Sequence, residues 1–258
     1  MAARVAGHCL LIAWGRVMDL DTLPRYRFPA TGPGREVLWM GEAESRRPVV
    51  LLHELAGLAG ETAHYARTLV EAGCVVHMPV IFGTAGQESW VKGAAQLCWG
   101  RQLTLILSDR RSKVADWLIG LCRHVKERHG RQVVVIGMCA TGGVVFSLLG
   151  DDAVGAGVSA QPSLPIRFPG SRPNIATLGA SVTDVETAAR SGKRLLALRY
   201  ENDRICPAGR IVQIQTSFPD AGLVELPGKL HSTLVYDPHD DARRGVIELL
   251  DEVFGGHD

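Results

Sequence analysis

The chain has 258 residues, a length that fits one large α/β domain, and its formal net charge is +1. Hydrophobic residues make up 46% and charged residues 21%, which excludes an intrinsically disordered protein. A charge so close to zero provides no basic surface for nucleic acid or an acidic membrane, so we expect neither partner. The six cysteines form no CxxC pair, which favours reduced thiols and a cytoplasmic location over a disulfide framework.

The N-terminal segment contains a short apolar run from Cys9 to Trp14. This run is too short to span a membrane, and no signal-peptide cleavage pattern follows it. We therefore expect residues 1–30 to be an N-terminal extension, either partly ordered or the result of a misplaced start codon. The folded domain is expected to comprise residues 31–258.

Short apolar runs alternate with helical patterns along the rest of the chain. Several runs are apolar on both faces, as strands covered by helices on both sides must be. The alternation predicts an α/β fold with a mostly parallel central sheet and helices on both faces. The predicted strands are 37–40, 49–53, 75–78, 133–137, 156–160, 195–200 and 222–226.

Helical periodicity is clear at 61–72, 113–128 and 242–254, where apolar residues recur on one face. A fourth helix is predicted to open at a capping box that starts with Thr183 and to stop near Gly192. His124 and His129 lie on the polar side of the 113–128 pattern, so we expect both to be solvated.

One strand leads into a turn that carries a cysteine, in the segment VVVIGMCATGG at residues 133–143. A strand that ends in Gly137, a nucleophile candidate at Cys139 and a following helix form the arrangement of a nucleophile elbow. The thiol would lie near a helix N-terminus, which favours the thiolate. The alternative interpretation is a buried structural cysteine beside a pair of helix-packing glycines.

Two later strands also end in residues with acid–base chemistry. Asp203 follows the strand at 195–200, and His231 follows the strand at 222–226. The order Cys139, Asp203, His231 is the order of nucleophile, acid and histidine in an α/β-hydrolase. Glu201, two residues before Asp203, is a competing acid.

The strand at 49–53 is followed by the loop HELAGLAG, which contains Glu54. In this fold one oxyanion-hole N–H comes from that loop and the other from the residue after the nucleophile. The predicted donors are therefore the backbone N–H groups of Leu55 and Ala140. An ionised Glu54 near a reactive thiol would be costly unless it acts as a base or is hydrogen-bonded.

Together, the HExxGL stretch, the cysteine elbow and the late Asp and His resemble the dienelactone hydrolase family, over roughly residues 37–254. The resemblance implies that Cys139 is the nucleophile and that His231 is the general base and acid. It further implies that Asp203 orients His231 and that Glu54 controls the protonation of the thiol.

The sequence departs from the family pattern at Thr141, where the family usually has glycine, and after His231, where no basic residue follows closely. We therefore expect a neutral, fairly hydrophobic substrate, with Trp90, Gln161 and Arg101 as candidate pocket residues.

The sequence predicts a hydrolase that cleaves a lactone, ester or thioester, with a small-molecule acyl or lactone substrate. We expect no cofactor and no metal, because no dinucleotide motif or metal-ligand spacing is present. The alternatives are an acyl transferase or cyclase on the same fold, and a non-catalytic ligand-binding protein.

Overall fold

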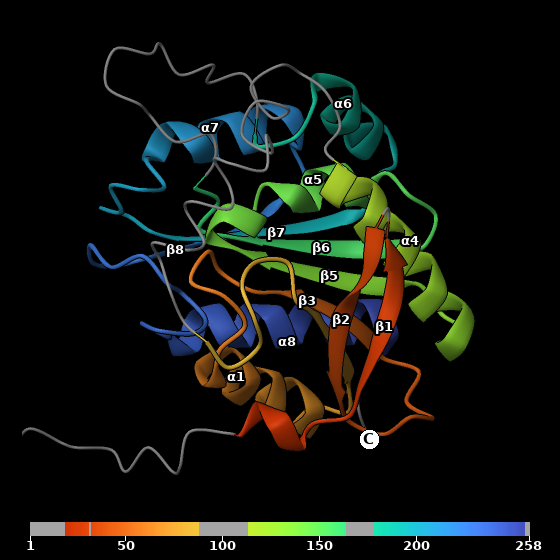
Figure 1. Cartoon of the computed structure of the whole chain (residues 1–258). Helices are drawn as coiled ribbons and strands as arrows, with labels where there is room; N and C mark the ends of the chain where they lie inside the picture. Colours follow the sequence, from red (N-terminus) through yellow and green to blue (C-terminus); the bar gives the residue numbers. More distant parts are fainter. Residues whose placement is uncertain (1–18, 31, 88–112, 164–177, 256–258) are drawn as a thin grey trace, which may run out of the picture.

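The computed structural model describes residues 19–30, 32–87, 113–163 and 178–255. Its centre is an eight-stranded sheet with the order β1-β2-β4-β3-β5-β6-β7-β8 (Figure 1). β1 pairs with β2 and β2 with β4 in the antiparallel sense, and all pairs from β4 to β8 are parallel. The predicted α/β class and mostly parallel sheet are therefore confirmed. The strands are β1 Arg25–Ala30, β2 Gly32–Met40, β3 Pro48–Leu52, β4 Val75–Pro79, β5 Val133–Met138, β6 Val154–Ala160, β7 Arg194–Tyr200 and β8 Gly222–Leu226.

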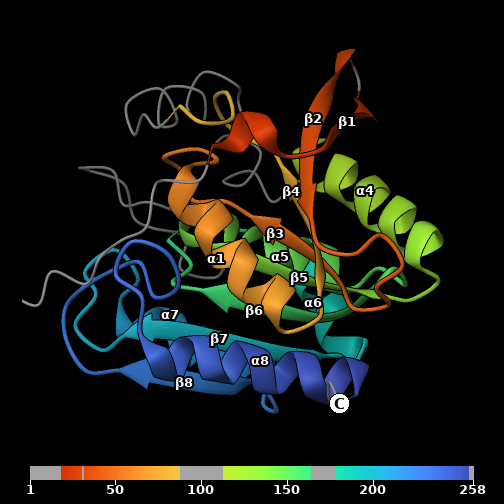
Figure 2. The same cartoon turned by 90° about the horizontal axis from the view of Figure 1, so that it is seen from below.

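Helices cover both faces of this sheet. α1 and α8 pack on one face and lie in front of the sheet in Figure 2, whereas α4 and α5 pack on the other. α6 packs against α5, and α7 contacts α6. The helices are α1 Gly60–Glu71, α4 Lys113–His129, α5 Val144–Leu149, α6 Val182–Arg190, α7 Ala208–Ser217 and α8 Asp240–Phe254, with short 3-10 helices η1 Leu20–Thr22 and η2 Cys139–Thr141.

Two hydrophobic cores result, one on each face of the sheet. β5 contributes to both, because successive side chains of a strand point to opposite faces. Val134 and Ile136 belong to the core under α1 and α8, while Val133 and Val135 belong to the core under α4 and α5. This two-sided burial explains why the central strands are continuous apolar runs in the sequence.

The start of α6 differs from the predicted capping box. Its N-cap is Ser181, whose hydroxyl accepts a hydrogen bond from the N–H of Asp184 at 3.1 Å. Thr183 already lies inside the helix. The prediction of Thr183 as the cap was therefore wrong by two residues, because both positions carry a hydroxyl and a carboxylate follows each of them three residues later.

The prediction that His129 is solvated was also wrong. His129 is buried, its Nδ1 donates to the carbonyl oxygen of Ser45 at 3.0 Å, and its Nε2 lies 3.1 Å from Nε2 of His77 on β4. Burial lowers the pKa of His77 to about 3, with a further contribution from the adjacent His129. Both imidazoles are therefore held neutral between α4 and the sheet.

Among the strands and α-helices that the structure describes, two were not expected from the sequence, β1 and α7. β1 contains Pro29, which an edge strand tolerates because one side of it has no neighbour. It lies within residues 1–30 and pairs with β2, so part of that segment belongs to the sheet. Among the described residues, no helix is both long enough and apolar enough to span a membrane.

Candidate active site

β5 turns into η2 and α5 at Cys139. The φ of Cys139 is 55°, a left-handed conformation that is rare for a residue other than glycine. A Cβ added at Gly137 would lie 2.4 Å from the carbonyl oxygen of Thr141 and 2.6 Å from Cγ2 of Val145. The turn is thus sharp enough to require glycine before it, and it places the thiol at the carboxyl end of the sheet.

Thr141 fits this turn through its hydroxyl group. Its Oγ1 lies 3.1 Å from the carbonyl oxygens of Leu52 and His53 and 2.9 Å from that of Met138, and it accepts from the N–H of Met138 at 2.9 Å. A hydroxyl has one hydrogen, so it can donate to one of these carbonyls at a time. Thr141 therefore joins the elbow to the end of β3, and the position does not require glycine.

The sulfur of Cys139 has a hydrogen-bond partner that the sequence did not suggest. Its Sγ lies 3.3 Å from Oγ of Ser163, and the N–H of Ser163 donates to the carbonyl oxygen of Cys139 at 3.1 Å. Ser163 is buried. Both the side chain and the backbone of the cysteine are thus bound to one residue of the loop after β6.

The loops after β7 and β8 bring Asp203 and His231 together. Nδ1 of His231 donates to Oδ2 of Asp203 at 2.7 Å, and Oδ1 of Asp203 accepts from the N–H groups of Ile205 and Cys206 at 2.7 and 3.1 Å. Glu201 is exposed, and its Oε1 accepts from the side chain of Asn202 instead. The carboxylate bound to the imidazole is therefore that of Asp203.

This arrangement changes how both groups titrate. Burial alone would raise the pKa of Asp203, but hydrogen bonds from His231 and two backbone N–H groups keep it below its ordinary value. Burial alone would lower the pKa of His231, but its contacts with Asp203 and Cys139 raise it to about 10. Nε2 of His231 is buried and has no hydrogen-bond partner among the described residues. The second ring nitrogen is thus available to a reacting group.

Glu54 lies in the interior beside this pair. Its side chain accepts at Oε1 from the hydroxyl of Ser232 at 2.6 Å and from Nε2 of Gln161 at 3.1 Å. Its Oε2 is buried without a partner in the described part of the chain. Burial raises the pKa of Glu54, and the hydrogen bond from Ser232 and the nearby His231 offset this only in part. The environment of this carboxyl therefore favours its protonated form more than water does.

Gln161 connects Glu54 to the loop that carries His231. Its Oε1 accepts from the hydroxyl and the N–H of Thr233 at 2.6 and 3.3 Å, while its Nε2 donates to Glu54. Its φ is 35°, another left-handed conformation, at the point where the chain leaves β6. The side chain is fully buried. The other two candidate pocket residues, Trp90 and Arg101, lie outside the described residues.

The loop after β3 lies against the elbow. Leu55, Cys139 and Ala140 form a small apolar cluster of their own, with Phe82 packed on it. His53 fixes this loop, since its Nδ1 donates to the carbonyl oxygen of Glu54 at 2.7 Å and its Nε2 accepts from a backbone N–H at 2.9 Å. Burial lowers the pKa of His53 to about 4, so it stays neutral and keeps both bonds.

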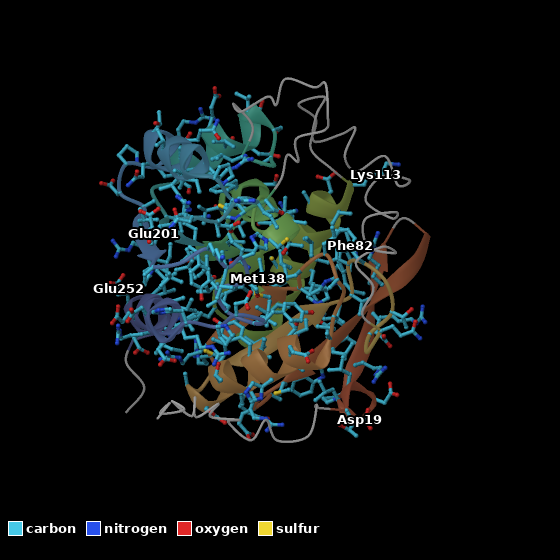
Figure 3. The ribbon with its side chains drawn as sticks, turned by 90° about the vertical axis from the view of Figure 1, so that its left-hand side faces the viewer. Asp19, Phe82, Lys113, Met138, Glu201 and Glu252 are labelled. Atoms are coloured by element: carbon cyan, nitrogen blue, oxygen red, sulfur yellow. The ribbon has the colours of Figure 1, made fainter. Side chains whose placement is uncertain are left out.

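Figure 3 gives a view onto the carboxyl ends of the parallel strands. Met138, the last residue of β5, lies near the middle of this view, between Phe82 and Glu201. Phe82 follows β4, and Glu201 follows β7. The residues that come together around Cys139 therefore lie at one edge of the sheet, as ligand and active sites of such sheets do.

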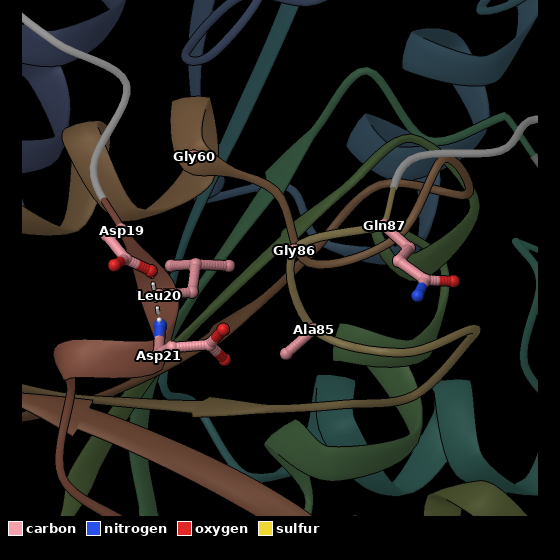
Figure 4. A pocket seen from close by; sticks show the side chains of 7 residues that line it. All are labelled: Asp19, Leu20, Asp21, Gly60, Ala85, Gly86 and Gln87. Carbon is pink, nitrogen blue, oxygen red and sulfur yellow. Dashed lines mark hydrogen bonds between the residues drawn. The ribbon is translucent and has the colours of Figure 1, made fainter.

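A cavity of about 330 Å³ lies elsewhere, beside the start of α1 (Figure 4). None of the residues around Cys139 lines it. Among the described residues, no cluster of three or more histidine, cysteine or acidic side chains could hold a metal ion. The lining residues of the cavity are Asp19, Leu20, Asp21, Gly60, Ala85, Gly86 and Gln87.

Comparison with protein families gives a match to the dienelactone hydrolase family over residues 36–232, more than half of the chain. The chain belongs to the dienelactone hydrolase family. A search of curated proteins gave no match.

Solved structures similar to this family member share its α/β-hydrolase fold at low sequence identity. A dienelactone hydrolase-like promiscuous phosphotriesterase from metagenomic libraries is 15% identical, with a TM-score of 0.65, and the match covers 91% of this chain and 99% of that one. An esterase from an Arctic intertidal metagenomic library is 14% identical, with a TM-score of 0.64 and coverage of 89% and 92%. A Pyrococcus furiosus esterase is also 14% identical, with a TM-score of 0.60 and coverage of 90% and 93%.

Sequence reasoning missed four residues around the site of this dienelactone hydrolase family member. They are Ser163, which bonds the sulfur; Ser232 and Thr233, which bond Glu54 and Gln161; and His53, which fixes the loop after β3. Ser232 and Thr233 directly follow His231, so two hydroxyl residues beside a candidate base were an available signal. Ser163 carried no comparable signal, because its contact depends on how the chain turns at Gln161.

Proposed function

We propose that this protein hydrolyses a lactone, ester or thioester through an intermediate in which the acyl group is bound as a thioester to the sulfur of Cys139. The observation that carries the proposal is a strained cysteine at a strand-to-helix turn, in contact with a histidine whose Nδ1 is bound to a buried aspartate. Nε2 of His231 has no hydrogen-bond partner in the described part of the chain. The pKa of His231 is raised, because Asp203 and Cys139 favour its charged form more than burial opposes it. Such an imidazole can stabilise a neighbouring thiolate.

In the first half of the reaction the thiolate of Cys139 attacks the acyl carbonyl. The negative charge that develops on the carbonyl oxygen is stabilised by the backbone N–H groups of Leu55 and Ala140. His231 donates its proton to the leaving oxygen or sulfur as the acyl bond breaks. The product is an acyl group bound to sulfur and an imidazole that is neutral.

In the second half a water molecule attacks the thioester. The neutral imidazole of His231 takes a proton from this water, and Asp203 stabilises the imidazolium that forms. The tetrahedral intermediate then collapses, the carbon–sulfur bond breaks, and its electron pair returns to Cys139. The acid product leaves, and the enzyme regains its thiolate and imidazolium.

Glu54 is assigned the control of the protonation of the thiol. Its carboxyl is buried and is connected through Ser232 and Gln161 to the segments that follow His231 and β6. A change in its charge would alter the field at the nearby imidazole, since His231 already influences its pKa. Gln161 would then affect the reaction indirectly, because it positions Glu54 and the loop that carries His231.

The substrate is proposed to be neutral and rather apolar. Two large apolar side chains near Asp203 and His231 in the sequence are exposed. Ile205, two residues after Asp203, has 54% of its surface exposed, and Leu230, directly before His231, has 48%. Trp90 and Arg101 remain candidate pocket residues. The four cysteines of the described residues are free thiols, which supports a reducing compartment such as the cytoplasm.

The test is hydrolysis of a panel of neutral and carboxylate-bearing aryl esters and lactones by the wild type, Cys139→Ala and Cys206→Ala. We expect turnover of the neutral substrates, loss of turnover in Cys139→Ala and retained turnover in Cys206→Ala. Cys206 is a suitable control because it is a buried thiol that follows the same acid. Binding of these esters without turnover by the wild type would favour a ligand-binding protein, and transfer to an added alcohol or amine would favour an acyl transferase.

A further inference from the structure

We infer that Ser163 is a further catalytic residue, whose hydroxyl donates a hydrogen bond to the sulfur of Cys139 while that sulfur carries negative charge. This inference rests on the proposed function, since it assigns a role in the same reaction. It concerns the hydrogen bond at 3.3 Å between Sγ of Cys139 and Oγ of Ser163.

Ser163 is held firmly at this position. Its N–H donates to the carbonyl oxygen of Cys139 at 3.1 Å, so backbone and side chain contact the same residue. Before it, Gln161 turns the chain with a φ of 35° and is fixed by its hydrogen bonds to Glu54 and Thr233. A serine at the end of such a braced turn loses little further freedom when it binds the sulfur.

This turn and the elbow are closely packed against each other. A Cβ added at Gly142 would lie 3.0 Å from Cα of Pro162 and 2.9 Å from the carbonyl oxygen of Ala160. Ser159, the second-to-last residue of β6, donates its hydroxyl to the carbonyl oxygen of Gly142 at 2.9 Å. Only glycine leaves the loop after β6 close enough for Ser163 to reach the sulfur.

The charges around the sulfur determine which atom donates. The groups that face it are the imidazole of His231 with Asp203 behind it, the thiol of Cys206 and, beyond the imidazole, the carboxyl of Glu54. In the ion pair of imidazolium and thiolate that the proposed reaction uses, the sulfur has no proton and can only accept, so the hydroxyl of Ser163 must donate. Hydrogen bonds to a charged atom are also the stronger ones.

This donor acts at two points of the proposed cycle. In the free enzyme it stabilises negative charge on the sulfur before the attack on the substrate. In deacylation the carbon–sulfur bond breaks and its electron pair goes to the sulfur, which then receives the hydrogen bond from Ser163. The proton remains on the serine throughout, so no additional acid or oxidant is required.

The test compares Ser163→Ala with Ser159→Ala, a matched variant that also removes a buried hydroxyl and its hydrogen bond at this turn but does not touch the sulfur. The rate of alkylation of Cys139 by iodoacetamide is measured against pH, with the modified peptide quantified by mass spectrometry. In Ser163→Ala we expect a rate about tenfold lower on the acidic side of the profile, since a hydrogen bond to a charged group contributes that much or more. Ser159→Ala should keep the wild-type profile.

A second pair of variants keeps the test decisive even if Ser163→Ala does not fold. Ser163→Thr keeps the hydroxyl, whereas Ser163→Val has nearly the same shape without it, so the threonine variant should resemble the wild type and the valine variant the alanine variant. Equal profiles for threonine and valine, or for Ser163→Ala and the wild type, would overturn the inference. Alkylation needs no turnover, so a failure of ester hydrolysis in the wild type would overturn the proposed function without deciding the role of Ser163.

Discussion

Replacing Asp203 with asparagine should slow the reaction strongly while leaving the fold intact. In the wild type, Oδ2 of Asp203 accepts the proton of His231 Nδ1, and Oδ1 accepts from the N–H groups of Ile205 and Cys206. Asparagine can keep the second set of bonds with its carbonyl oxygen. Its NH₂ group would then face Nδ1 of His231 and favour the ring tautomer with the proton on Nε2, which cannot act as a base.

The magnitude follows from the environment of the imidazole. Its pKa is raised from 6.5 to about 10, so the folded site favours the imidazolium by about 5 kcal/mol relative to water. Burial opposes this preference, and Asp203 and Cys139 provide it, so removal of the carboxylate charge leaves Cys139 alone to favour the imidazolium. We expect kcat to fall about 10⁴-fold, the loss typical when the acid of such a triad becomes its amide.

The assay is aryl ester hydrolysis by Asp203→Asn, with the protonation of His231 followed by NMR across pH. The matched control is Glu201→Gln, which changes the exposed competing acid two residues earlier and should keep wild-type activity. If Asp203→Asn lost less than about tenfold, or Glu201→Gln lost more than Asp203→Asn, the assignment of the acid would be refuted.

Three further predictions concern the thiol, the elbow and the acid stability of the fold. Glu54→Gln should raise the alkylation rate of Cys139 about threefold or more on the acidic side of the profile, because a buried carboxylate opposes a nearby thiolate; an unchanged alkylation profile would show that Glu54 does not control the thiol. Gly137→Ala should lower the free energy of unfolding by about 1–3 kcal/mol or more through backbone overlap, while Gly209→Ala, which has nothing within 4 Å, should leave the melting temperature unchanged or slightly higher. Burial lowers the pKa of His77 from 6.5 to about 3, so the unfolded chain binds its proton first and stability should decrease as pH falls below 6.5; His77→Gln should reduce this decrease in melting temperature, and an equal slope in both proteins would contradict the neutral buried imidazole.

The sequence was informative wherever a strand end determined the position of a side chain. Parallel strands have their carboxyl ends at one edge of the sheet, so Cys139, Asp203 and His231 could be predicted to lie near one another from their order after β5, β7 and β8. The same logic located the loop that contains Glu54 after β3. The mostly parallel sheet followed from apolar runs whose two faces are both buried.

What the sequence could not provide depends on backbone turns and on contacts between distant elements. Ser163 reaches the sulfur only because Gln161 adopts a positive φ, which no residue pattern at that point signals. His129 lies on the polar side of a helical pattern, but His77 of β4 faces it and both become buried. Thr141 is a departure from a family glycine, and its fit depends on the carbonyl oxygens at the end of β3.

The central claim is that an acyl group passes through the sulfur of Cys139. The most direct measurement is mass spectrometry of the wild-type enzyme quenched with acid during turnover of a slow aryl ester, followed by digestion and analysis of the peptide that contains residues 133–143. The account predicts an added acyl mass on Cys139 that forms before product is released, and its absence from Cys139→Ala, which should also lack turnover. An acyl group on Ser163 or Cys206, or full turnover by Cys139→Ala, would contradict the account.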